Sequence, residues 1–393
     1  MRFCKKVVLI LLLTWLLVSC SGEQTPPQLL LTVSKKAVDL GMCFPKGTTE
    51  IWRLQEPFDK RQILLSNPDV NYFAPAFSPN GEWIAYIESN PSASYLGEQK
   101  RPTPGHDVVW IMRANGSEKR QVSEYLDSVD EHTNHTCYPH EYIVHSLQWS
   151  LDGNYLHFIH NRIQGNGIVY DNYIFDMREG ESYFIGEGTI FEFSPDSNSY
   201  LIGDWENGYL KKGRLEDLPE SELENLPLDM FAGVPLSAGW PAGFGEPYIR
   251  TRNNETNILW EYDPALKIWR KLWEQSGSLI EVGQTWTAFF VEDQLMLIDS
   301  RSGSQHVSVP LKTQSYEMQA CLGFMGFCQQ KLLMIDKNQN IWMMALGNSG
   351  IQSTKELFEW QSLASDMDYW LVIGEESWWD PGGKMVRKTR CAP

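Results

Sequence analysis

The sequence predicts an all-β fold, namely a β-propeller built of four-stranded antiparallel blades. Three similar segments recur over residues 74–89, 145–160 and 189–203 of the 393-residue chain. Each segment carries a tight-turn dipeptide between apolar runs, which indicates a β-hairpin. The apolar strands also lack the alternation of a half-exposed sheet, so both of their faces are expected to be covered. Small sheets that stack face to face around an axis provide that environment.

The turn dipeptides give each segment a defined local structure. Each dipeptide follows an aromatic residue and a serine, and the three are Asn80-Gly81, Asp152-Gly153 and Asp196-Ser197. Hairpin turns of this kind need positive φ angles, which Gly and Asn adopt at little cost. We therefore expect the first two strands of three blades to be joined at these turns.

A second hairpin completes the first two of these units. Residues 107–112 lead through a turn at 114–117 into a short strand at 120–122. In the next unit, residues 173–177 lead in the same way into a strand at 182–185. Four strands within about 40–50 residues are typical of a propeller blade.

The pattern of these units resembles the WD-repeat-like blades of TolB-type propellers. It runs Phe-Ser-Pro-Asn-Gly at residues 77–81, Ile-Ala-Tyr at 84–86 and Trp-Ile-Met at 110–112. The resemblance covers about a third of the chain and implies a propeller fold and an extracytoplasmic location. The chain departs from the TolB pattern in two ways: no small α/β domain precedes the propeller, and the chain carries a lipidation motif. The resemblance therefore says little about a shared partner.

The two ends of the chain are expected to close the ring together. A strand at 369–374 lacks partners of its own, and strands at 49–54 and 62–65 lack an inner pair. Combining them gives one blade, which removes the open sheet edges that separate ends would expose. We expect seven blades, with six or eight as alternatives, in a single propeller domain over residues 41–393.

The N-terminus is expected to be a lipoprotein signal peptide over residues 1–19. A basic start precedes an apolar run at 7–18, which is shorter than the roughly 20 residues of a membrane-spanning helix. Leu17-Val18-Ser19-Cys20 resembles the bacterial lipobox, which implies cleavage after Ser19 and a lipid on Cys20. Residues 20–40 would then be a polar tether. Ser21 at the next position favours the outer membrane where the cell has one, and the outer face of the cell membrane otherwise.

Charge excludes nucleic acid as a partner. The chain has 33 Lys and Arg against 50 Asp and Glu, a net charge of −17. Proteins bind phosphate backbones by displacing counterions with Lys and Arg, so a chain this acidic is repelled. The chain is also rich in tryptophan, with 16 residues. Those at strand positions are expected to fill the space between blades: Trp83, Trp110, Trp149, Trp260, Trp286, Trp342 and Trp370.

Five cysteines lie outside the expected signal peptide and lipidation site. Because this number is odd, at least one of them stays free or pairs between chains. Cys43 lies where the domain is expected to begin and Cys391 where it ends. A disulfide between them would tie the two ends in an oxidising compartment. Five cysteines allow other pairings, and the sequence does not choose among them.

A histidine-rich insertion at 132–145 is the one candidate metal site. His132, His135, Cys137 and His140 are all metal-capable side chains, and imidazole and thiolate suit Zn, Cu or Ni. The insertion falls between two blades, and long connections at 90–106 and 161–170 are expected on the same face of the propeller. Against a metal, the spacing matches no structural zinc template, and we expect a solvated loop with no metal bound.

These observations favour a lipid-anchored, extracytoplasmic propeller that binds a protein, peptide or glycan at its loop face. We expect no catalytic residue and no cofactor. The alternative is a metal-assisted polysaccharide lyase or hydrolase that uses the insertion at 132–145. No hydrolase nucleophile elbow, P-loop or dinucleotide-binding glycine pattern occurs in the chain. The sequence does not identify the ligand.

Overall fold

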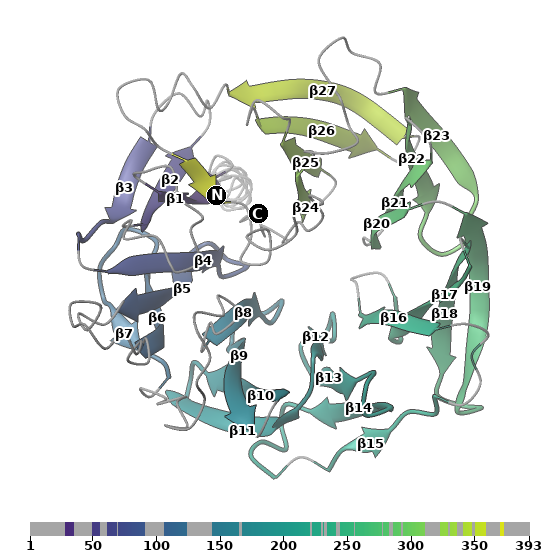
Figure 1. Ribbon diagram of the computed structural model, residues 1–393, viewed down its shortest axis with the longest axis horizontal. Helices are drawn as coiled ribbons and strands as arrows, with labels where there is room; N and C mark the ends of the chain where they lie inside the picture. Colours follow the sequence, from purple (N-terminus) through teal and green to yellow (C-terminus); the bar gives the residue numbers. More distant parts are fainter. Residues whose placement is uncertain are drawn as a thin grey trace, which may run out of the picture.

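The strands of the chain form a ring of small sheets (Figure 1). The computed structural model describes residues 28–34, 49–55, 61–68, 70–90, 106–123, 144–164, 167–220, 222–228, 231, 234–240, 244–254, 256–276, 278–282, 286–291, 294–310, 323–328, 331–335, 341–347, 350–358 and 370–372. Within these residues, the strands make seven four-stranded antiparallel sheets. The predicted fold class is therefore confirmed, and the blade number of the whole chain stays a prediction.

Six sheets each take four consecutive strands, and the first strand of each lies nearest the centre of the ring (Figure 1). Their strands are β4 (Asn71–Phe77), β5 (Trp83–Asn90), β6 (His106–Arg113) and β7 (Arg120–Gln121); β8 (Val144–Trp149), β9 (Tyr155–Gln164), β10 (Gly167–Asp176) and β11 (Glu181–Glu187); β12 (Ile190–Phe193), β13 (Ser199–Asp204), β14 (Tyr209–Arg214) and β15 (Glu224–Asn225); β16 (Val234–Gly239), β17 (Tyr248–Asn253), β18 (Thr256–Asp263) and β19 (Ile268–Ser276); β20 (Ser278–Val282), β21 (Trp286–Val291), β22 (Gln294–Asp299) and β23 (Gln305–Pro310); β24 (Gly323–Cys328), β25 (Lys331–Ile335), β26 (Ile341–Gly347) and β27 (Gly350–Phe358). No helix long and apolar enough for a membrane crossing occurs in these ranges.

The seventh sheet combines the two ends of the chain, as predicted. Its order is β28 (Trp370–Val372), β1 (Gln28–Ser34), β2 (Thr49–Gln55) and β3 (Arg61–Leu65). β28 pairs with β1 over three positions, from Thr32 opposite Val372 to Ser34 opposite Trp370. The C-terminal strand is thus the innermost strand of a sheet whose other three strands come from the N-terminal end.

The position of β1 corrects the expected tether over residues 20–40. Gln28–Ser34 is a strand of the ring, paired along its whole length with β2. The sheets therefore begin at Gln28 and not after residue 40. The physical reason is the apolar run Leu29-Leu30-Leu31, since Leu30 is buried against the neighbouring sheet.

The three predicted first hairpins share one hydrogen-bonded turn. A serine Oγ accepts the backbone N–H five residues ahead at 2.8–3.0 Å and donates to the Asn or Asp Oδ1 two residues ahead at 2.6–2.7 Å. That Oδ1 also accepts the N–H of the residue four after the serine, at 3.0–3.1 Å. The three serines are Ser78, Ser150 and Ser194. The next turn position has positive φ in each case: 69° at Gly81, 73° at Gly153 and 56° at Ser197.

Aspartates close a second family of turns. Their Oδ1 accepts the backbone N–H groups two and three residues ahead at 2.7–3.3 Å. The fourth residue ahead has positive φ, which glycine adopts without a steric cost in three of the four turns. The aspartates are Asp176, Asp204, Asp263 and Asp299.

Apolar side chains fill the space between neighbouring sheets. Trp149 is 1% exposed, and its indole Nε1 donates to the carbonyl of Ala76 in the next sheet at 3.1 Å. All seven predicted tryptophans lie in strands. Among those whose side chains are described, Trp149 is fully buried, whereas Trp83, Trp110 and Trp260 are only half-buried. Arg113 stacks on the Trp83 ring at 4.1 Å, so this tryptophan packs partly against a charged side chain at the surface.

The ring has two distinct faces. We call the side on which second strands lead to third strands, and fourth strands to the next sheet, the loop face. The opposite side is the turn face, and it carries the three serine turns. One expected loop is wrong: residues 161–164 and 167–170 belong to β9 and β10, which pair from Gln164 opposite Gly167 to Tyr155 opposite Asp176. The strands simply continue beyond the length of their neighbours.

Removal of residues 366–393 should abolish cooperative unfolding. The truncation deletes β28 and leaves β1 as an unpaired inner edge, with one side of the ring open. Thermal melting followed by circular dichroism and light scattering should show aggregation or a broad, shifted transition.

The matched control is a shorter truncation that removes residues 376–393 and keeps β28 intact. It should melt like the full chain. If the longer truncation also melts like the full chain, closure through β28 and β1 does not stabilise the ring.

Candidate functional site

The loop face of sheets β4–β7 and β8–β11 gathers the ends of several segments. Asn90 at the end of β5 pairs with His106 at the start of β6. Val144 at the start of β8 pairs with His160 of β9. The β9–β10 hairpin extends on the same side, because second strands run towards the loop face. Three connections therefore leave the ring from one region, which we take as the candidate site.

Buried polar side chains of β9 and β10 lie between this region and the turn face. His157 is fully buried, and its ring stacks on Phe191 of the next sheet with centroids 3.5 Å apart and an interplanar angle of 5°. Its Nε2 lies 2.9 Å from Oδ1 of Asn172. The Asn172 amide nitrogen donates to the carbonyls of Tyr170 and Gly188 at 3.0 and 2.8 Å. Because that nitrogen is used twice as a donor, Oδ1 faces the histidine and His157 Nε2 carries the proton.

Two further polar pairs lie in the same sheet, one towards the loop face and one near the turn face. His160 and Asp171 are opposite each other on β9 and β10, and each is 5% exposed. On the inner strand, the Gln148 amide donates to a Glu192 carboxylate oxygen of the next sheet at 2.8 Å. Strand interiors of this kind are normally apolar, and buried polar groups need such partners. Buried polar groups therefore occur along the length of this sheet, and only His160 and Asp171 lie towards its loop-face end.

The predicted site residues themselves lie outside the described residues. These are the metal candidates His132, His135, Cys137 and His140, the lipidation site Cys20 and the disulfide pair Cys43 and Cys391. In the described part of the chain, no three His, Cys, Asp or Glu side chains gather as a metal site would require. The structure does place the end of the histidine-rich insertion at 132–145, because Val144 lies opposite the buried His160.

Sequence reasoning missed the two histidines of β9. It used residues 145–160 only as a hairpin, although Tyr-Leu-His-Phe-Ile-His at 155–160 carries two imidazoles in an otherwise apolar strand. Their spacing of three puts them on opposite faces of the strand. His157 accordingly faces sheet β12–β15, and His160 lies on the face of Leu156 and Phe158, which pack towards sheet β4–β7. Two histidines in a strand that was expected to be covered on both faces could have indicated this buried polar site.

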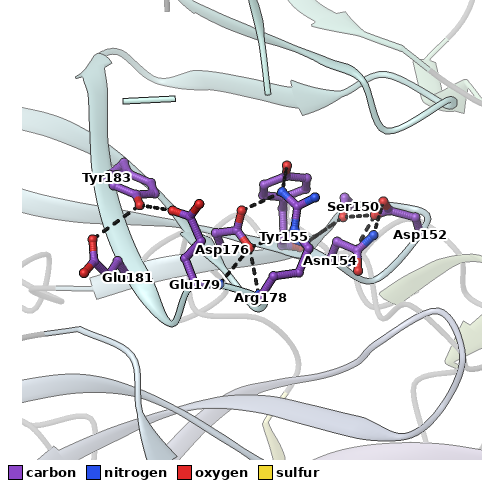
Figure 2. A network of polar contacts seen from close by, with 9 residues as sticks. All are labelled: Ser150, Asp152, Asn154, Tyr155, Asp176, Arg178, Glu179, Glu181 and Tyr183. Atoms are coloured by element: carbon purple, nitrogen blue, oxygen red, sulfur yellow. Dashed lines mark hydrogen bonds and ion pairs between the residues drawn. The ribbon is translucent and has the colours of Figure 1, made fainter. Parts of the chain in front are cut away.

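The turn face carries a larger network of charged groups, which has a structural role. Figure 2 shows Arg178 between Asp176 and Tyr155, with Glu179, Tyr183 and Glu181 beside them. The Arg178 guanidinium lies 2.7 Å from Asp176 Oδ2 and also donates to the Tyr155 hydroxyl. Tyr183 donates to Glu179. Each group holds a turn or a strand end, and we therefore assign the network to the stability of this hairpin.

Asp176 is the electrostatic centre of that network. Burial by itself would raise the pKa of its carboxyl, but hydrogen bonds from the Arg178 side chain and from the backbone N–H groups of Arg178 and Glu179 outweigh burial and lower that pKa. The same contacts raise the pKa of Arg178. Both shifts favour the charged pair in the folded state.

Comparison with solved structures shows the fold of the chain. Prolyl oligopeptidase B from Galerina marginata is 10% identical, with a TM-score of 0.53, over 79% of this chain and 47% of that one. The β-propeller domain of the trilobed protease from Pyrococcus furiosus, described as having an open velcro topology, is 13% identical, with a TM-score of 0.51, over 86% and 97%. TolB from Acinetobacter baumannii is 12% identical, with a TM-score of 0.39, over 70% and 62%.

These similarities show a β-propeller and nothing about activity, because the identities are so low. This chain spans less than half of the oligopeptidase and less than two thirds of TolB. No protein-family model matches the chain. No curated protein matches it in sequence.

The change Asp176→Asn should destabilise the protein at pH 7 by about 1–2 kcal/mol, because it removes the charge-assisted contacts with Arg178, which is largely exposed to solvent. The folded-state pKa of Asp176 lies below its unfolded value of about 3.9, so this stabilisation is present above that pH and is lost as pH falls. Urea unfolding from pH 7 to pH 3 should show the difference between the two proteins shrinking.

Glu179→Gln is the control, because Glu179 is exposed and in the same turn. It should change stability by less than about 0.5 kcal/mol at pH 7. A wild-type advantage over Asp176→Asn that grew towards pH 3 would contradict the assigned charge on Asp176.

Proposed function

We propose that the chain is a lipid-anchored, extracytoplasmic β-propeller that binds a protein, peptide or glycan partner at its loop face. The lipid is carried by Cys20, the proposed first residue after cleavage. A rigid ring that presents connections at one end is a common scaffold for recognition. No cofactor is part of the proposal.

The observation that carries the proposal is the place where β1 begins. Gln28 pairs with Gln55, the residue at the turn-face end of β2, so the chain enters the ring on the turn face. Seven residues, 21–27, separate Cys20 from Gln28. At about 3.5 Å per residue, they reach about 25 Å at most. A lipid on Cys20 would therefore hold the turn face near the membrane and direct the loop face away from it.

The loop face suits recognition in two further respects. The β9–β10 hairpin extends there, next to the ends of two connections. The buried contacts of His157 and Asn172 fix the base of this hairpin, which limits the entropy lost on binding. A hairpin whose base is fixed in this way suits a partner that binds with little rearrangement of the loop face.

A metal-assisted lyase or hydrolase is the second candidate. It is favoured by one observation, namely that the end of the histidine-rich insertion at 132–145 lies opposite His160, with Asp171 on the next strand. Imidazole and carboxylate are metal-capable ligands. Metal analysis of protein purified without a histidine tag separates the two candidates, and binding without catalysis predicts no bound metal.

The anchor is tested by Cys20→Ala. Metabolic labelling with an alkyne analogue of palmitate should mark the wild-type protein and fail to mark this variant, because the thiol is the proposed site of acylation. The variant should also leave the membrane fraction.

The matched control is Cys43→Ala, which lies beyond the lipobox and should be labelled like the wild type. Labelling of Cys20→Ala at the wild-type level would contradict the lipoprotein assignment.

The binding face is tested by photo-crosslinking in cells. A benzoylphenylalanine at Asn207 or Asn254, exposed positions on the loop face, should give a discrete covalent adduct of higher mass. The same group at Leu151 or Leu266, which are 57% and 64% exposed on the turn face, should give none. Gel shifts after irradiation and mass spectrometry of the adduct provide the measurement.

Adducts formed only from the turn-face positions would reverse the proposed orientation. Equal adducts from all four positions would show that contacts are non-specific. Either result contradicts partner binding at the loop face.

A further inference from the structure

Arg250 of β17 is unusual among the arginines whose side chains are described. Its Nε is buried and has no hydrogen-bond acceptor among the described residues. The other described arginines each have a carboxylate, a hydrogen-bond acceptor or an aromatic ring. Burying a positive charge without a partner reduces the stability of a protein. Arg250 has no such partner among the described residues, although the chain carries a net charge of −17 and so has many carboxylates.

The position of Arg250 points to the space between two sheets. Arg250 lies opposite Leu259 of β18, and Leu259 packs with Ile298 of β22 in the neighbouring sheet. Arg250 therefore lies on the side of its sheet that faces β20–β23. The residues on either side of it, Ile249 and Thr251, lie on the opposite face, where Thr251 Oγ1 accepts from Trp260 Nε1.

A second guanidinium lies beside it. Arg252 is two residues further along β17, so its side chain is on the same face about 7 Å away, nearer the loop face. Its Nε donates to the Asn254 carbonyl at 2.9 Å, and it has no ion pair with a described residue. Burial lowers the pKa of Arg250; Tyr248 acts in the opposite direction, and the positive charge of Arg252 lowers that pKa further. The two side chains thus form a cationic pair without a described carboxylate to neutralise it.

We infer that Arg250 and Arg252 form a binding site for a single oxyanion group, a carboxylate or a phosphate, between sheets β16–β19 and β20–β23. A guanidinium presents a planar fork of donors that matches such a group, and an anion would compensate both charges at once. The acidic body of the protein favours one carboxylate or phosphate group over a polyanion. This site is separate from the hairpin region of the proposed function and stands without it.

The test is the melting temperature of the full chain in sodium acetate or sodium phosphate, compared with sodium chloride at equal ionic strength and pH 7. An anion at ten times its Kd should raise the melting temperature by about 2 °C. Phosphate also stabilises proteins by exclusion from their surface, so the diagnostic quantity is the difference between wild type and variants. A response to acetate identifies a carboxylate site, and a response to phosphate alone identifies a phosphate site.

The change Arg250→Met should abolish the anion-dependent increment, and it should raise the melting temperature in chloride because it removes an uncompensated charge. Arg252→Gln tests the same site at an exposed position whose loss does not threaten folding, and it should at least halve the increment. Arg214→Met is the control, since Arg214 is exposed and paired with Glu216 at 3.4 Å. It should keep the full increment.

Two results overturn the inference. One is a wild-type protein that gains nothing from either anion beyond the gain of Arg250→Met. The other is an increment that survives in both Arg250→Met and Arg252→Gln, which would assign Arg250 a purely structural role.

Discussion

Backbone pairing between β1 and β28 is the interaction on which the ring depends. It spans only three residue pairs, yet it joins segments about 340 residues apart in sequence. Each four-stranded sheet buries its faces only against its two neighbours, so an open ring would leave two faces and an inner edge exposed. The cluster of Leu30, Ile51, Leu65, Tyr86 and their neighbours, which joins this sheet to β4–β7, needs β1 in its place. Closure therefore determines whether the other sheets have partners.

The fold could be predicted from the sequence because its turns are local. A serine followed two residues later by Asn or Asp fixes a hairpin through hydrogen bonds within six residues, and three such turns set the register of three sheets. The aspartate turns have an equally local signature, since in three of the four the Asp lies four residues before a Gly. Short-range chemistry of this kind is visible in a single sequence.

Long-range features were harder to predict. The apolar stretch of β1 follows a polar segment next to the predicted signal peptide, and only its pairing with β2 and β28 distinguishes a strand from a tether. The length of β9 and β10 could not be predicted either. These strands continue past the ends of their neighbours, and no turn dipeptide in the sequence marks where their hairpin ends. The candidate site shares this difficulty. The buried histidines and Arg250 have roles set by neighbours on other sheets, as the stacking of His157 on Phe191 illustrates.

The two faces of the ring therefore differ in their chemistry. On the turn face, the serine turns and the Asp176 network satisfy most of their polar groups within one sheet, and the Asp152 N–H donates to Ser197 Oγ of the next sheet. Polar groups also enter the covered interior: His160 and Asp171 lie towards the loop face in one sheet, and Arg250 lies near the middle of β17 in another. Such violations of an apolar interior reduce stability and are expected where function maintains them. His160 and Asp171 lie towards the side opposite the entry of β1, which is the side that a short N-terminal anchor would leave accessible.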